Sequence, residues 1–64
     1  MPGYRCYLFD VDDQILDVGS SQQPDDEAAT RWAGDLLRRD RAARAVELWD
    51  LARFLGRQER QQLG

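Results

Sequence analysis

The chain has 64 residues, with nine Arg, no Lys, no His, a single Cys and a net charge of -3. This length allows one small domain, and the composition excludes an intrachain disulfide, a Cys/His zinc site, a Ser-His-Asp triad, a Schiff-base lysine and the lysine of a phosphate-binding loop. Seven of the 27 apolar residues are Ala and two lie at the termini, so 18 sizeable apolar groups remain for a core. A core this small is marginal without a partner or another stabilising element.

The charge is unevenly distributed along the chain. Residues 1–37 carry a net charge of -6 and residues 38–64 carry +3, so the opposite halves of two copies could attract each other. The first strand-like run follows the N-terminus without a signal-like leader. No window approaches the roughly 18 consecutive apolar residues of a membrane span, in keeping with a mean hydropathy of -0.71. We therefore expect a cytoplasmic protein.

The first predicted element is a β-hairpin. The run from Tyr4 to Phe9 is aromatic and apolar, which is typical of a strand. An Asp-rich turn separates it from the next run, residues 14–18, which closes at Gly19. Apolar residues occur on both faces of the first strand, so we expect a central strand that is covered on both sides. Cys6 lies within this strand, where a buried, reduced thiol is expected.

A polar connector, residues 19–24, leads to the most strongly predicted element, a helix with Asp25 as its N-cap. Acidic residues in the first turn and arginines in the last turn match the helix dipole. Gly34 stands in mid-helix at a cost of about 1 kcal/mol relative to Ala, and we interpret it as a place where the helix approaches the sheet. One helical face carries the apolar residues Ala29, Trp32, Ala33, Leu36 and Leu37.

Residues 45–58 fit two structures. Local propensity favours a helix, because Ala, Leu, Glu and Arg dominate. Two strands are also consistent, since Val46 and Leu48 alternate with Glu47 and Trp49 before a turn at Asp50-Leu51, and Arg53, Leu55 and Arg57 then alternate with Phe54 and Gly56. A lone two-stranded hairpin is marginal in water, so the N-terminal hairpin needs further strands. The polar residues 58–64 are expected to form a disordered tail.

Four short motifs follow one another along the chain: Tyr4-Arg5-Cys6-Tyr7, Leu8-Phe9-Asp10, Asp25-Asp26-Glu27-Ala28, and Ala45-Val46-Glu47-Leu48-Trp49 through Gly56-Arg57. Together they resemble a group of short uncharacterised bacterial proteins. Members often carry Gly in the last turn, where this chain has Leu51. The resemblance implies the order strand, strand, helix, strand, strand and brings no activity.

These patterns predict a single α+β domain over residues 1–64. A small antiparallel sheet of order β-β-α-β-β would pack one amphipathic helix on one face. The alternative is a β-hairpin followed by two helices. Continuous helical structure over residues 45–57 would distinguish the alternative from the sheet.

The segment YLFDVDDQIL, from Tyr7 to Leu16, resembles the first motif of the haloacid dehalogenase superfamily of phosphatases. The resemblance implies a nucleophile at Asp10 and an acid/base at Asp12. It stops there, because Gln14 stands where that family has Thr, and the chain is too short for a parallel sheet with its crossovers. We therefore prefer a hairpin turn, with phosphoryl transfer as the disfavoured alternative. The same acidic cluster lacks the Gly and Glu of a calcium-binding loop, so neither a metal nor a cofactor is predicted.

A basic cluster stands at the end of the predicted helix. The Arg38–Arg44 cluster contains Arg38, Arg39, Arg41 and Arg44. Nucleic-acid binding usually requires a basic balance over the whole domain, whereas this chain has a pI of about 4.7. We interpret the cluster as a solvated helix end, with weak nucleic-acid binding as the alternative.

The aromatic residues suggest an interface. Trp32 belongs to the apolar helical face and is assigned to the core, but in the hairpin interpretation Trp49 lies on the opposite face from Val46 and Leu48. Large exposed apolar surface is typical of a contact with another molecule. The candidate interface residues are Tyr7, Phe9, Trp49 and Phe54. The function hypothesis is therefore a non-enzymatic protein-interaction or regulatory module that self-associates as a homodimer, with another protein as the alternative partner.

Overall fold

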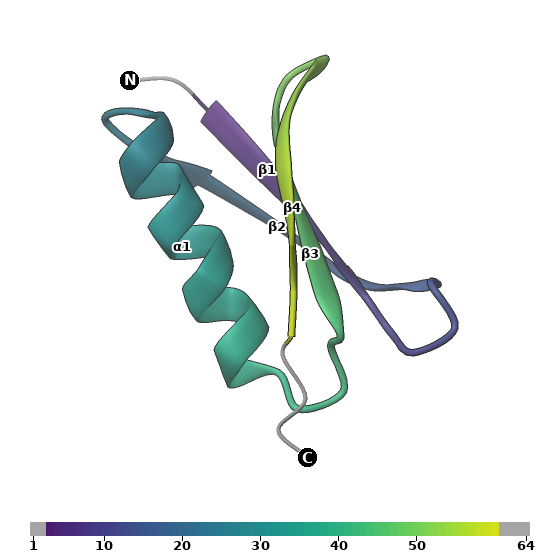
Figure 1. Ribbon diagram of the computed structural model, residues 1–64. Coiled ribbons are helices and arrows are strands. Elements are labelled where there is room, and N and C mark those ends of the chain that lie inside the picture. Colours follow the sequence, from purple (N-terminus) through teal and green to yellow (C-terminus); the bar gives the residue numbers. More distant parts are fainter. Residues whose placement is uncertain (1–2, 61–64) are drawn as a thin grey trace.

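The computed structural model describes residues 3–60 and contains a four-stranded antiparallel sheet with one helix against one of its faces (Figure 1). The strands lie in the order β2-β1-β3-β4. This architecture confirms the predicted α+β fold of order β-β-α-β-β, and the alternative with two C-terminal helices is wrong. The elements are β1 (Gly3–Phe9), β2 (Ile15–Gln22), α1 (Asp26–Arg39), β3 (Ala45–Asp50) and β4 (Arg53–Glu59).

The C-terminal hairpin forms because the central strand needs a second neighbour. β1 pairs with β2 on one side and with β3 on the other, and β4 then extends the sheet beyond β3. Val46 and Leu48 are buried on the side that faces α1. Burial and strand pairing therefore override the helical propensity of residues 45–58.

The core lies between α1 and the two central strands. The helix contributes mostly small side chains, so that its backbone comes close to the sheet. Trp32 and Leu36 pack half-buried against the edge of this core. The buried side chains of the cluster are Tyr4, Cys6, Leu8, Ala29, Ala33, Leu37, Ala43, Val46 and Leu48.

β2 is longer than expected. The predicted connector began at Gly19, but β2 continues to Gln22, which pairs with Gly3 of β1. Backbone pairing does not require apolar side chains, so the polar end of this segment joins the sheet. Gly19 also makes room for the helix, since a methyl group there would lie 3.2 Å from the Leu36 Cδ1 atom.

Gly34 is buried and marks the predicted close approach between α1 and the sheet, in this case on the β4 side. A methyl group at Gly34 would lie 3.0 Å from the Gln58 Oε1 atom. The Gln58 Nε2 group donates a hydrogen bond of 3.0 Å to the carbonyl oxygen of Thr30. The side chain of a β4 residue therefore rests directly on the helix backbone.

A bulge in β4 changes the expected alternation of its side chains. Trp49 pairs with Phe54 and Leu48 pairs with Gly56, so Leu55 is the extra residue. Phe54 and Arg57 consequently reach the same face, which strict alternation had separated. Pairing with β3 determines the face on which Phe54 and Arg57 lie, and the sequence of β4 alone does not predict it.

The prediction of a disordered tail from residue 58 is wrong for residues 58–60. β4 runs to Glu59, and the backbone N–H of Arg60 donates to the Arg44 carbonyl at 2.7 Å. The Arg60 guanidinium also donates to the carbonyl oxygens of Leu37, Asp40 and Ala43 at the end of α1. Residues 58–60 are therefore ordered, and residues 61–64 lie outside the described residues.

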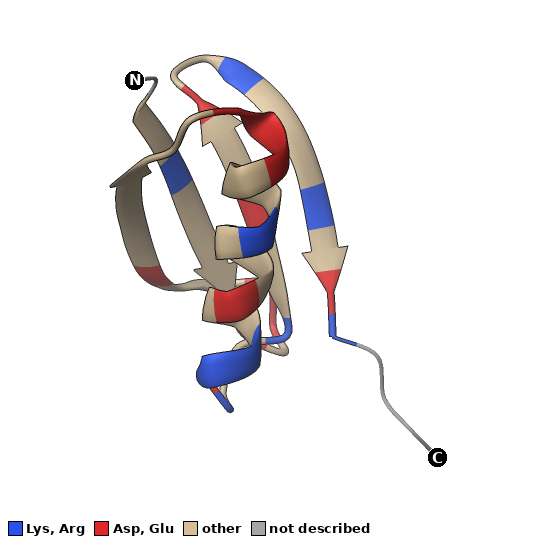
Figure 2. Cartoon of the chain, turned by 90° about the vertical axis from the view of Figure 1, so that its left-hand side faces the viewer, with Lys and Arg blue, Asp and Glu red and all other residues tan. Residues whose placement is uncertain are grey.

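The helix ends match the predicted charges, as Figure 2 shows from the side of α1. Asp25 is the N-cap, and its side chain accepts a hydrogen bond of 2.8 Å from the N–H of Ala28. Acidic residues occupy the first turn and arginines the last, where each favours the helix dipole. Within residues 3–60, no helix has the length and apolar character needed to cross a membrane.

Candidate interaction surface

The sheet face opposite α1 has no element over it in the described part of the chain, and we call it the open face (Figure 1). Cys6 and Leu8 are buried against the helix, so the alternating side chains of Tyr7 and Phe9 project the other way. Strand pairing places the remaining members beside them. The larger side chains of the open face are Arg5, Tyr7, Phe9, Ile15, Val18, Glu47, Trp49, Phe54 and Arg57, and the register also places Ser20, Ala45 and Glu59 on this face.

All four predicted interface residues lie on this open face. Trp49 and Phe54 form a tilted aromatic pair with ring centroids 5.1 Å apart. Phe54 remains 50% exposed, whereas Tyr7, Phe9 and Trp49 are half-buried by their neighbours. β1, β3 and β4 thus bring residues 7, 9, 49 and 54 together although they are far apart in the sequence.

Arg57 organises the charges of the open face. Its guanidinium lies 5.1 Å from the ring centroid of Phe9, within the range of a cation–π contact. It also forms ion pairs with Asp13 at 2.9 Å, Glu47 at 3.2 Å and Glu59 at 3.4 Å. The hydrogen bond to Asp13, followed by that to Glu47, raises the pKa of Arg57, so the group stays charged and paired.

These pairs alter the interpretation of the opposite charge halves. Arg57 and Arg53 belong to the basic half, yet they pair with Asp13 and Asp26 of the acidic half within the same chain. Part of the attraction expected between two copies is therefore used inside one copy. Charge asymmetry along the sequence does not by itself support association.

The open face contains a shallow hollow of about 370 Å³. Its lining combines aromatic, aliphatic and one acidic side chain: Tyr7, Phe9, Ile15, Glu47, Trp49 and Leu51. Glu47 is already occupied, because it accepts hydrogen bonds from Arg57 and from the Trp49 indole N–H at 3.3 Å. The hollow therefore suits an apolar side chain better than an ion.

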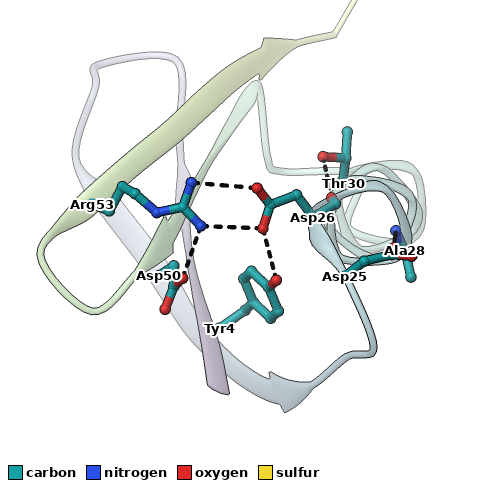
Figure 3. Close-up of polar contacts among 7 residues, drawn as sticks. All are labelled: Tyr4, Asp25, Asp26, Ala28, Thr30, Asp50 and Arg53. Atoms are coloured by element: carbon teal, nitrogen blue, oxygen red, sulfur yellow. Dashed lines mark hydrogen bonds and ion pairs between the residues drawn. The ribbon is translucent and has the colours of Figure 1, made fainter. Parts of the chain in front are cut away.

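A second polar cluster joins the start of α1 to the sheet (Figure 3). The Tyr4 hydroxyl donates to the Asp26 carboxylate at 2.8 Å, and the Arg53 guanidinium bridges Asp26 at 3.2 Å and Asp50 at 2.9 Å. The hydrogen bond to Asp26, assisted by burial, raises the pKa of Tyr4 to about 12. Hydrogen bonds from Tyr4 and then Arg53 lower the pKa of Asp26. Every member is paired, so the cluster fastens α1 and leaves no free reactive group.

The Asp-rich segment is a turn, as predicted. One oxygen of the Asp10 carboxylate accepts the backbone N–H groups of Asp12 at 2.8 Å and Gln14 at 2.9 Å. Asp13 adopts a positive φ of 62°, which Asp tolerates well. Within residues 3–60, no three His, Cys, Asp or Glu side chains converge as a metal site would require.

The Arg38–Arg44 cluster surrounds the C-terminal end of α1 and the loop that follows (Figure 2). Arg38 forms an ion pair with Asp35 one turn earlier, and the other three arginines are exposed. The cluster lies at the negative end of the helix dipole, as expected for a solvated helix end. None of its four arginines belongs to the open face, and none lines the hollow.

Cys6 is fully buried beneath α1, as predicted, and burial raises the pKa of its thiol to about 12. A thiol in this environment is a poor nucleophile. Several open-face residues were not identified from the sequence, above all Arg57, Val18 and Ile15. Their membership depends on strand register, for which short sequence patterns carry little signal.

No known protein family, curated protein or solved structure matches the chain. The functional assignment therefore has to come from the open face itself. Its aromatic composition, its paired charges and its hollow are the observations on which it depends.

Proposed function

We propose that the chain is a small non-enzymatic interaction module that forms a homodimer through the open face, in the cytoplasm. One observation carries the proposal: four of the six aromatic side chains lie on the sheet face that α1 leaves uncovered. Exposed apolar patches of this kind are typical of protein interfaces. Aromatic side chains are also the residues that contribute most when an interface closes.

The charges of the open face favour a second copy as the occupant. The guanidinium of Arg57 and the indole N–H of Trp49 already have partners in the same chain. They can therefore leave water without losing hydrogen bonds. Among the described residues, Arg5 is the one cation of the open face that forms no ion pair. Nucleic-acid binding usually requires several cations that are free to contact phosphates.

The size of the open face sets the expected affinity. Four strands of about seven residues cover roughly 23 Å by 19 Å, so two copies would bury on the order of 900 Å² as flat surfaces. This area lies at the low end of specific protein interfaces. We therefore expect a dimer with a dissociation constant in the micromolar range.

Sedimentation equilibrium over a wide micromolar range tests the proposal. We expect a reversible monomer–dimer equilibrium that Phe54→Ser shifts toward the monomer by at least about tenfold, which is about 1.4 kcal/mol. Phe54 is half exposed, so its loss leaves the fold intact. The control is Val11→Ser, because Val11 is 73% exposed in the turn between β1 and β2. A folded wild type that stays monomeric throughout the range contradicts the proposal.

The two tryptophans provide a built-in reporter. Trp32→Phe leaves Trp49 on the open face, and its emission should shift to longer wavelength on dilution as the interface opens to water. Trp49→Phe leaves Trp32 on α1, whose emission should not depend on concentration. Equal shifts in both variants contradict an interface at the open face. Salt-sensitive retention on heparin would instead support the nucleic-acid alternative.

A further inference from the structure

The turn between β3 and β4 contains a strained and exposed leucine. Asp50 pairs with Arg53 across this turn, so only Leu51 and Ala52 connect the strands. Leu51 has a positive φ of 55°, a conformation that glycine adopts freely and a bulky residue rarely adopts. The side chain is also 89% exposed, more than any other large apolar side chain among the described residues.

Both properties of Leu51 work against folding of the isolated chain. Left-handed backbone at a residue with a Cβ atom lowers the folded-to-unfolded ratio by roughly five- to thirtyfold. The exposed side chain recovers nothing through burial. A strained, exposed apolar residue is therefore consistent with a role that appears when another molecule covers it.

The position of Leu51 indicates what that molecule is. Leu51 lines the rim of the open-face hollow beside Trp49, and it also lines a second hollow of about 720 Å³ formed with the ends of β1 and β2. The hollow beside Trp49 is apolar apart from Glu47, which is already paired. The anchor and a receptor of matching chemistry thus belong to the same chain.

We infer that Leu51 is the anchor of the homodimer and that each copy inserts it into the open-face hollow of the other. A two-fold interface makes such contacts reciprocal, because residue i of one copy meets residue j of its partner and the reverse. This inference rests on the proposed function, and it names the residue that determines the dimer. The Asp50–Arg53 ion pair at 2.9 Å, continued to Asp26, holds the turn that presents Leu51.

Leu51→Asn separates folding from association. Asn tolerates positive φ and is polar, so the folded-to-unfolded ratio should rise severalfold. The dissociation constant of the dimer should rise by at least about tenfold, because the apolar anchor is lost. Val11→Asn is the matched control, since it makes the same change in the other exposed apolar turn residue, and we expect it to leave the dissociation constant unchanged. Chemical denaturation and sedimentation equilibrium measure the two quantities.

The outcomes distinguish this inference from the proposed function. If the wild type dimerises and Phe54→Ser weakens the dimer while Leu51→Asn leaves its dissociation constant within twofold, the anchor assignment is wrong and the open-face dimer stands. If the wild type remains monomeric, both are wrong. Leu51→Gly is a second variant, which removes the side chain without introducing an amide group. A stable fold with weakened association in this variant would support the assignment of Leu51 as the anchor.

Discussion

The two faces of the sheet are both apolar but are built from different residues. On the covered face, small residues make much of the contact with α1: Ala29 and Ala33 belong to the helix, and Cys6 and Gly19 belong to the sheet beneath it. The open face instead holds Tyr7, Phe9, Trp49 and Phe54 in the company of paired charges. The larger aromatic surface is thus on the side without a helix.

This difference arises because α1 packs closely on one face of the sheet, whereas no described element packs on the other. A helix can pack against a sheet at short distance only where small side chains leave room for its backbone and for residues such as Trp32. The covered face therefore stabilises the monomer through close packing. The open face has no such restriction, and its large rings remain suited to the flatter surface of a second sheet.

The largest expected effect is on the covered face. Leu8→Ala should lower the free energy of unfolding by about 2–5 kcal/mol, because it leaves a cavity beneath α1. Phe54→Ala on the open face should cost less than about 1 kcal/mol in the monomer, since its ring is half exposed. Urea denaturation at submicromolar concentration measures both. Equal losses would mean that the open face is already part of the monomer core.

Glycine replacements test the closeness of the helix. Gly19→Val should lower the free energy of unfolding by about 1–3 kcal/mol, because the added atoms meet Leu36 and Trp32. Gly56→Val is the matched change in β4, where a Cβ atom has no neighbour within 4 Å. It should be neutral or slightly stabilising, as β-branched residues suit strands. Equal losses in the free energy of unfolding for Gly19→Val and Gly56→Val would contradict a close approach of α1 at Gly19.

A smaller effect concerns the helix start. Asp25→Ala removes the N-cap acceptor of the Ala28 N–H and should lower the free energy of unfolding by about 1 kcal/mol. Association of the folded protein should keep its dissociation constant, because α1 lies on the covered face. A change in both quantities would show that the two faces are coupled.

The smallest expected effect is the pH dependence of stability, because Tyr4 and Asp26 change their protonation only far from neutral pH. The pKa of Tyr4 is about 12 in the folded chain against 10.0 normally, so its contribution is complete below pH 10 and declines as the pH rises through 12. The pKa of Asp26 is lowered from 3.8, so its contribution is lost as the pH falls below that value. Thermal unfolding of the wild type and Tyr4→Phe should differ in their alkaline slopes, and identical slopes would contradict the Tyr4–Asp26 bond.

Local residue patterns were sufficient for much of this molecule. The alternation in β1 and β3, the 3.6-residue apolar spacing of α1 and the Asp25 cap each depend on neighbours within a few positions. Together with the need for more than two strands, they predicted the α+β order. The same alternation separated Tyr7, Phe9 and Trp49 from the side chains that face α1, whereas the side on which Phe54 lies depends on the bulge in β4.

Features that depend on pairing between distant segments were not accessible in this way. The full length of β2, the bulge at Leu55 and the three carbonyls bound by Arg60 all involve partners remote in the sequence. Strand register is a long-range property, and a shift of one residue moves a side chain to the other face. Composition and spacing therefore identify the elements and their apolar residues, whereas three-dimensional packing places Arg57 beside Phe9 and leaves Leu51 strained and exposed.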